Sequence, residues 1–145
     1  MKSLKPYLFL IALFFSLSIY AQEHKFKRFQ QYCLCESELY QEIEQDSILN
    51  INITGDNVLT IDVVSYSTCY TPHFGAVKFL NDTLALRYGH EKFDPPSGFQ
   101  VIGHVDNPSG IVEILDCGSN FLFGFTIAGI TEIPNAILLN GKRIR

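Results

Sequence analysis

Four cysteines, at positions 33, 35, 69 and 117, carry the most distinctive chemistry in this chain. In an oxidising compartment an even number of cysteines predicts disulfides rather than free thiols. A bond between Cys33 and Cys35 would close a very small, strained ring. We therefore expect two disulfides that join Cys33 and Cys35 to Cys69 and Cys117, in either order, with an extended backbone at residues 33–35 so that both sulfurs point to one side.

A Cys-x-Cys pair is also compatible with soft-metal binding or thiol redox chemistry. A single Cys69–Cys117 disulfide would leave Cys33 and Cys35 reduced and reactive, and this is the alternative function. The spacing differs from that of zinc modules, which use Cys-x2-4-Cys and His-x3-5-His pairs. We expect neither a metal nor a cofactor.

His90, Glu91 and Asp94, together with His73, form the one group of residues typical of an acid–base or hydrolytic site. No nucleophile motif accompanies them, because Gly-x-Ser-x-Gly, the phosphate-binding loop, Gly-x-Gly-x-x-Gly and His-Glu-x-x-His are all absent from the sequence. We expect no catalytic activity.

These residues belong to a chain of 145 residues, 47% hydrophobic and 18% charged, which excludes a disordered protein. Lys2 and Lys5 precede an apolar run at residues 6–19 that spans about 21 Å, less than the roughly 30 Å of a bilayer core. This pattern predicts a signal peptide at residues 1–21, cleaved after Ala21, and export to a periplasmic or extracellular space. An uncleaved membrane anchor is the alternative.

Cleavage would remove two lysines and no acid, leaving 11 − 2 = 9 basic against 15 acidic side chains, a net charge of −6. This balance argues against nucleic acid as a partner. Five acids lie within residues 36–46, and basic clusters lie at 25–28 and 142–145. A solvated face explains such clusters, and a site for a cation or a basic partner is the functional alternative.

Apolar and polar residues alternate after residue 47, which predicts strands and hairpins. A three-residue turn at 55–57 would pair Leu49 with Val63, Ile51 with Ile61 and Ile53 with Leu59, followed by a bulge at Val63-Val64. A two-residue turn at Asn81-Asp82 would pair Val77 with Leu86 and Phe79 with Leu84, with Lys78 and Arg87 on the other face.

Further strands are expected at residues 99–105, 111–117, 121–128 and 137–144, the last with an Asn140-Gly141 turn. About eight short strands predict an all-β domain at residues 47–145, a two-sheet antiparallel β-sandwich of immunoglobulin-like type; a small closed barrel is the alternative. Phe26, Phe29 and Cys33 have helical spacing, so the lead-in at 22–46 is expected to hold a short helix or an edge strand.

Three segments of the sequence resemble a group of small exported bacterial proteins whose function is uncharacterised. They are Cys69 to Tyr88, Asp116-Cys117 leading into the aromatic strand that ends at Ile127-Ala128-Gly129, and Leu139-Asn140-Gly141-Lys142. The resemblance covers about the last half of the chain. It implies a β-sandwich and export, and it assigns no activity.

Together these features predict an exported, disulfide-supported structural or binding module that contacts an envelope or extracellular macromolecule. The contact surface is expected in the loops at one end of the sandwich, because exposed aromatic residues in loops are frequent binding anchors. It comprises Tyr70, His73, Phe74, His90 and Phe93. Asn52 and Asn81 match the glycosylation acceptor pattern.

Overall fold

A computed structural model describes residues 24–34, 46–68, 73–89, 94–103 and 118–145. These residues form nine strands and no helix. The strands are β1 (Lys25–Cys33), β2 (Ser47–Thr54), β3 (Val58–Thr68), β4 (Phe74–Leu80), β5 (Thr83–Gly89), β6 (Gln100–Gly103), β7 (Gly118–Ala128), β8 (Ala136–Leu139) and β9 (Lys142–Arg143).

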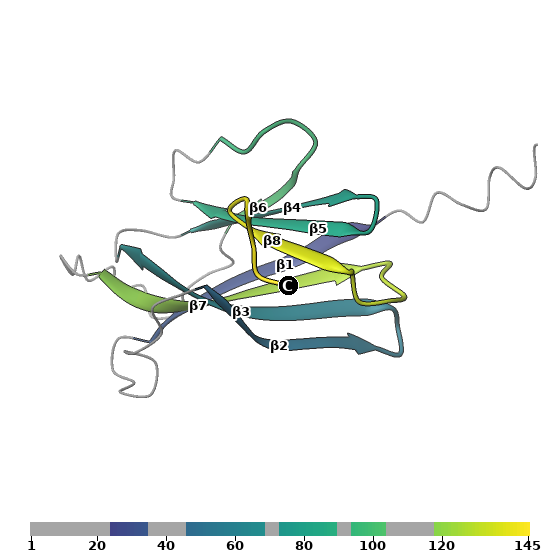
Figure 1. The fold of residues 1–145 in the computed structure, drawn as a ribbon, viewed down its shortest axis with the longest axis horizontal. Helices are drawn as coiled ribbons and strands as arrows, with labels where there is room; N and C mark the ends of the chain where they lie inside the picture. The colour runs from purple at the N-terminus through teal and green to yellow at the C-terminus, as the bar shows by residue number, and fades with distance from the viewer. Residues whose placement is uncertain (1–23, 35–45, 69–72, 90–93, 104–117) are drawn as a thin grey trace, which may run out of the picture.

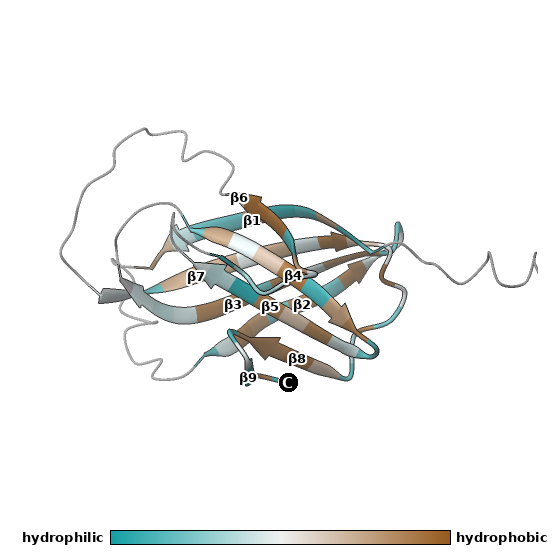
Figure 2. Ribbon diagram, turned by 90° about the horizontal axis from the view of Figure 1, so that it is seen from above, coloured by the Kyte–Doolittle hydropathy of each residue, from teal (hydrophilic) through white to brown (hydrophobic). Residues whose placement is uncertain are grey.

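The strands form two sheets packed face to face, which confirms the predicted β-sandwich (Figure 1). One sheet has the order β1-β7-β3-β2 and the other has the order β6-β4-β5-β8-β9. Seen from above, the five-stranded sheet lies over the four-stranded one (Figure 2). All neighbouring strands are antiparallel except β5 and β8, which run parallel. The closed barrel is therefore excluded, and the expectation of purely antiparallel sheets is wrong at this one pair.

Strand β7 supplies the centre of the core. It lies between β1 and β3, and Phe121, Phe123, Phe125 and Ile127 all point inward and are buried. Their counterparts on the other sheet include Val77, Leu84 and Leu86, and further core residues come from β3 and β8. This period-two burial is what the alternation in the sequence predicts, because successive side chains of a strand point to opposite faces.

The hairpin between β4 and β5 has the predicted register, with Val77 opposite Leu86 and Phe79 opposite Leu84. Asn81 in its turn has φ +56°, a left-handed conformation that asparagine tolerates better than most residues. The Asn140-Gly141 turn likewise has positive φ at both positions and pairs Leu139 with Lys142. Both tight turns were therefore identified from their residue types.

The hairpin between β2 and β3 is only partly as predicted. Ile53 lies opposite Leu59 and Ile51 opposite Ile61, as expected. The pairing of Leu49 with Val63 is wrong, because Ile48 takes that place. The bulge that shifts the register lies on β2 between Ile48 and Asn50 rather than at Val63-Val64, and it leaves Leu49 exposed.

The lead-in forms an edge strand, which was one of its two predicted alternatives, and not the short helix. Residues 25–33 form β1, which pairs with β7 along its whole length. A bulge between Phe26 and Arg28 turns both Phe26 and Phe29 toward the core, three positions apart. One extra residue in a strand changes the period from two to three at that point, so the spacing that suggested a helix comes from a bulged strand.

Other predictions fall on residues 1–23, 35–45, 69–72, 90–93 and 104–117, outside the described part of the chain. They include the signal peptide, the strand at 111–117 and most of the acidic run. Within the described ranges, none of the chain forms a helix with the length and apolar character required to cross a membrane.

The two sheets are in direct contact where the Phe29 ring of β1 packs against Gly75 of β4. Phe29 is fully buried, and a side-chain carbon added to Gly75 would overlap its ring. We expect Gly75→Ala to lower the free energy of unfolding by about 1–3 kcal/mol through overpacking.

Urea unfolding of Gly75→Ala measures this effect. Gly55→Ala is the matched control, because a carbon added to Gly55 in the β2–β3 turn has nothing within 4 Å. Equal stability of the two variants would contradict the close approach.

Candidate functional site

A buried chain of hydrogen bonds centres on His73, the residue before β4. Its side chain is 0% exposed. Nδ1 and the backbone N of His73 both lie within hydrogen-bond distance of Gln31 Oε1, at 2.5 and 2.8 Å. Because a carbonyl oxygen only accepts, Nδ1 is the donor, and a neutral ring then accepts the Ser67 hydroxyl at Nε2, 3.0 Å away. The chain joins β1 and β3 of one sheet to the start of β4 in the other.

Three aromatic rings enclose His73. The ring centroids of Phe121, Phe123 and Tyr88 lie 5.4, 5.1 and 5.7 Å from the imidazole centroid. Buried polar groups without partners are costly, and here both imidazole nitrogens have oxygen partners. The surroundings therefore hold the imidazole in one orientation.

The same arrangement resembles an activated nucleophile, in which a histidine accepts the serine proton and an oxygen bound to its other ring nitrogen orients the ring. Such a site must meet its substrate, yet Ser67 is only 8% exposed and His73 is sealed. What the arrangement does in this structure is link the two sheets through polar contacts at one end of the core.

A second polar chain runs beside the first. Asp46 Oδ1 accepts the Ser65 hydroxyl at 2.5 Å, and Ser65 Oγ lies 2.7 Å from the Tyr88 hydroxyl. Burial raises the pKa of the Tyr88 hydroxyl, the hydrogen bond that Tyr88 donates to Ser65 Oγ opposes that shift, and the nearby charge of Asp46 adds to it. Tyr88 also stacks on Phe123 at 4.0 Å between ring centroids. Its phenol is therefore a neutral link between the sheets.

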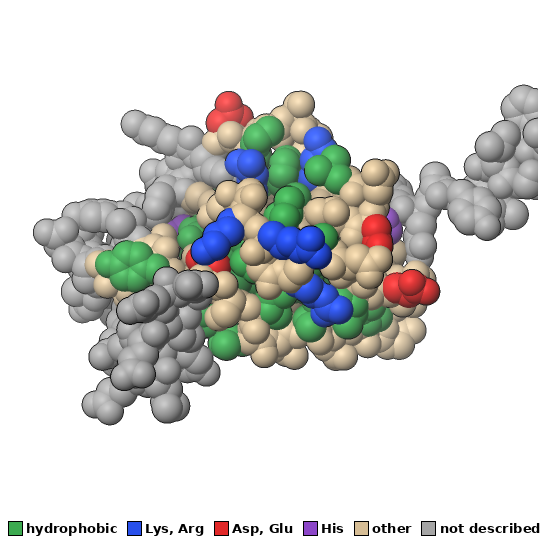
Figure 3. Space-filling model, in the orientation of Figure 1, with side chains coloured by type: hydrophobic (Ala, Val, Ile, Leu, Met, Phe, Trp, Pro, Cys, Tyr) green, Lys and Arg blue, Asp and Glu red, His purple; other side chains and the backbone are tan. Residues whose placement is uncertain are grey.

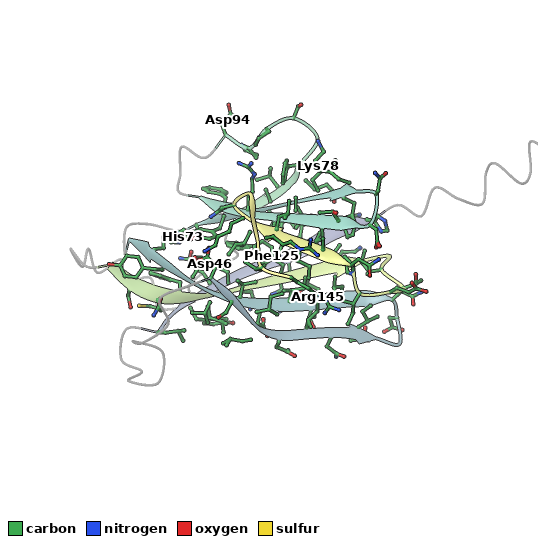
Figure 4. All side chains as sticks on the ribbon, viewed as in Figure 1. Asp46, His73, Lys78, Asp94, Phe125 and Arg145 are labelled. Atoms are coloured by element: carbon green, nitrogen blue, oxygen red, sulfur yellow. The ribbon has the colours of Figure 1, made fainter. Side chains whose placement is uncertain are left out.

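The predicted loop surface is not assembled as expected. His73 cannot serve as a binding anchor, because it is buried among aromatic rings. Phe74 is half-buried on β4, and Tyr70, His90 and Phe93 lie outside the described residues. Figure 4 places His73 between the sheets and Asp94 on an outer loop, so these two members of the proposed acid–base group point to different parts of the molecule.

Cys33, at the end of β1, is disulfide-bonded. Cys35, Cys69 and Cys117 lie outside the described residues, so the predicted pairing remains a prediction. In the part of the chain that the structure describes, no three His, Cys, Asp or Glu side chains are grouped so that they could hold a metal ion.

A small cavity lies at the other end of β4, between the β4–β5 turn and residues 130–134. Two of its polar side chains, His24 and Asp82, have partners within the protein. The His24 ring stacks on Phe79 at 4.2 Å and its Nδ1 lies 3.0 Å from the Gly129 carbonyl oxygen, and the Asp82 carboxylate accepts a hydrogen bond from Asn135. These contacts hold residue 24, before β1, and the β4–β5 turn against the segment that follows β7.

Basic side chains cluster on the side of the molecule that Figure 1 views, around β8 and the C-terminus. Figure 3 shows lysines and arginines gathered over β8, β9 and the neighbouring strands. We call this surface the basic face, and it comprises Lys78, Arg87, Lys142, Arg143 and Arg145. No Asp or Glu of the described residues forms an ion pair with any of the five, and Arg143 Nε donates to the main-chain oxygen of Arg145 at 2.7 Å. The face therefore presents positive charge that no described Asp or Glu side chain neutralises.

Strand register sets the dimensions of the basic face. Lys78 lies opposite Ala85, Ala85 opposite Leu138, and Leu138 opposite Arg143. Strands are about 4.8 Å apart, so three steps separate the Lys78 and Arg143 backbones by about 14 Å. Ala85, between them, is 7% exposed. Leu138 also lies between the two cations, and Lys142 lies opposite Leu139, whose side chain faces the core, so the register places Arg143 but not Lys142 on the outer side of the sheet with Lys78.

An aromatic ring adjoins the cations at one end of this row. Lys78 Nζ and the Arg87 guanidinium lie 5.8 and 5.4 Å from the centroid of Phe99, within the range of a cation–π contact. Lys78 Nζ also donates to the Ser97 carbonyl oxygen at 3.0 Å. These contacts fix the two side chains at the surface.

The described residues as a whole are basic, whereas the full chain is acidic. They contain eight lysines and arginines against six acids, or 8 − 6 = +2, while the whole chain has a net charge of −4. The acidic excess belongs to segments outside the described residues. Within the described part, the Asp46 carboxylate accepts the Ser65 hydroxyl.

Comparisons of this chain with protein-family models, with curated proteins and with solved structures find no match. The site is therefore interpreted from its own geometry.

We expect His73→Leu to lower the free energy of unfolding by about 2–3 kcal/mol, because it leaves the Ser67 hydroxyl buried without its partner. In the double variant Ser67→Ala/His73→Leu both partners are gone, so its cost should be smaller than the sum of the single variants. Urea unfolding of the three variants tests this. Additive costs would show that the Ser67–His73 contact contributes nothing to stability.

We also expect stability to fall as the pH rises through about 10 and above, since the folded state raises the pKa of Tyr88 and so binds that proton more tightly than the unfolded chain does. Tyr88→Phe should remove part of this alkaline loss. Denaturant midpoints from pH 8 to pH 11 measure it. Tyr66→Phe, at a ring that is 65% exposed, is the control, and an equal effect of both substitutions would exclude Tyr88 as the cause.

Proposed function

We propose that this protein is an exported, disulfide-supported binding module without catalytic activity, and that the basic face is its contact surface. The observation that carries the proposal is the set of five basic side chains on one side of the molecule, none of which is ion-paired with an Asp or Glu of the described residues. Side chains held out of ion pairs on an otherwise acidic chain are available to an external anionic group.

The distribution of polar chemistry supports a binding role over a catalytic one. The Ser67–His73–Gln31 chain lies inside the core and connects the sheets, and Cys33 is engaged in a disulfide. The basic face, by contrast, is at the surface, on a rigid sheet whose backbone positions are set by strand pairing. Rigid elements present a binding surface at low entropic cost.

The expected partner is an anionic macromolecule of the cell envelope or the extracellular space. Export is proposed from the apolar run at residues 6–19 and from the resemblance to small exported bacterial proteins. Nucleic acid is not expected, because the mature chain would carry a net charge of −6 and would act in a compartment without it.

A thiol-redox or soft-metal protein using Cys33 and Cys35 is the alternative function. It requires both cysteines to be reduced in the protein's own compartment. Thiol titration and metal analysis of protein purified from that compartment distinguish the two proposals. Two free thiols, or one equivalent of bound metal, would favour the alternative.

The binding proposal predicts that Lys142→Glu/Arg143→Glu weakens binding of the labelled protein to envelope fragments of its source cells by about tenfold or more. Lys27→Glu/Arg28→Glu, on β1 of the other sheet, is the matched control, because it makes the same charge change at exposed positions. Equal binding by both variants would show that the basic face is not the contact surface.

A further inference from the structure

We propose that two copies of this protein pair through strand β2, so that their four-stranded sheets join into one continuous sheet. β2 forms one edge of its sheet (Figure 1), and an edge strand presents backbone N–H and C=O groups that no neighbouring strand has paired. No residue of the basic face belongs to β2, so this inference does not depend on the proposed function.

The hydrogen bonds of the β2–β3 hairpin determine which backbone groups of β2 point outward. The Thr54 carbonyl oxygen accepts from the Asn57 N–H at 3.0 Å, and the Asn52 carbonyl oxygen accepts a hydroxyl of β3 at 3.4 Å. In an antiparallel pair, successive residues of a strand direct their backbone groups to opposite sides. Those of Ile51 and Ile53 therefore point away from β3, and no described residue forms a hydrogen bond with them.

The other three sheet edges are protected against such pairing. At β1, the Gln100 side chain takes the place of a strand, because Phe26 N donates to its Oε1 at 2.7 Å and its Nε2 donates to the His24 carbonyl oxygen at 2.6 Å. Strand β6 has four residues, and β9 has two, both basic. Short strands and charged side chains are common means of blocking an edge. β2, by contrast, has eight residues and contains neither a charged residue nor a proline.

The regular part of β2 matches itself in antiparallel pairing. Beyond the bulge near its start, Ile51 and Ile53 pack against the core, whereas Asn50, Asn52 and Thr54 are exposed. A two-fold axis at Asn52 places Ile51 of each copy opposite Ile53 of the other, and Asn52 opposite itself. The two isoleucine pairs then exchange the backbone hydrogen bonds that point outward in the single chain.

Apolar side chains meet where the two copies join. Opposite residues of an antiparallel pair lie on the same face of the sheet, so the half-buried Ile51 and Ile53 of both copies adjoin on the core side. Each copy thereby covers apolar surface that the other exposes to water. Like charges do not oppose each other, because β2 is uncharged. A second copy therefore satisfies both the backbone and the side chains of this edge.

Charge substitutions at Asn52 test the arrangement, because residue 52 of one copy faces residue 52 of the other. Sedimentation velocity and light scattering measure the mass of the full-length mature protein over a range of concentrations. We expect a dimer whose dissociation constant rises about tenfold in Asn52→Lys and in Asn52→Glu, where like charges lie directly opposite. An equimolar mixture of the two variants should form the dimer again, since unlike charges then face each other.

Gln30→Lys and Gln30→Glu are the matched controls, because they replace an amide with the same charges on β1, at the opposite edge of the sheet. Both should dimerise as the wild type does. Urea unfolding verifies that all four variants are folded, and gel electrophoresis without reductant detects any intermolecular disulfide.

Three outcomes would overturn the inference. The first is a wild-type protein that stays monomeric at every concentration. The second is a dimer that an intermolecular disulfide holds together, or one that the Asn52 substitutions weaken no more than the Gln30 substitutions do. The third is a mixture of Asn52→Lys and Asn52→Glu that dimerises no better than either variant alone, which would place the contact away from the two-fold axis at Asn52.

Discussion

The rest of the sandwich depends on the fit of the Phe29 ring into the space that Gly75 leaves open. Phe29 reaches this position because the bulge in β1 turns it, together with Phe26, toward the core. The ring then lies against Phe123 and Phe125 of β7. One extra residue on an edge strand thus sets how closely the two sheets pack, and the close packing brings Gln31, two residues along β1, within reach of His73.

Local patterns in the sequence predicted the parts of the fold that depend on neighbouring residues. The turns at Asn81 and Asn140 and the aromatic strand β7 follow from residue type and alternation. Two predictions were wrong: the helix in the lead-in and the pairing of Leu49. Both were wrong for the same physical reason. A bulge changes the spacing of buried residues in a strand, and no particular residue type marks its position in the sequence. The parallel pairing of β5 with β8 is non-local and has no turn to indicate it.

The sequence predicted two separate groups of basic residues, but it did not predict that they lie near each other in the structure. Alternation places Lys78 and Arg87 together on the outer face of their hairpin, and the cluster at 142–145 is evident in the sequence. Only the pairing of β5 with β8 brings the two groups onto one sheet. The hydrogen-bond network around His73 was harder to predict from the sequence. Gln31 is distant from His73 along the chain, Ser67 lies on the preceding strand, and a histidine just before a strand is typical of a loop.

The position of β1 has a consequence for how the molecule assembles. Lys25 pairs with Ala128, so the first strand of the described chain finds its neighbour only when most of the remaining sequence is present. Until then its buried faces, including Phe26 and Phe29, have no sheet to cover them. Contacts between such distant residues slow folding, and a chain that emerges from its N-terminus must keep this segment from aggregating while it waits for β7.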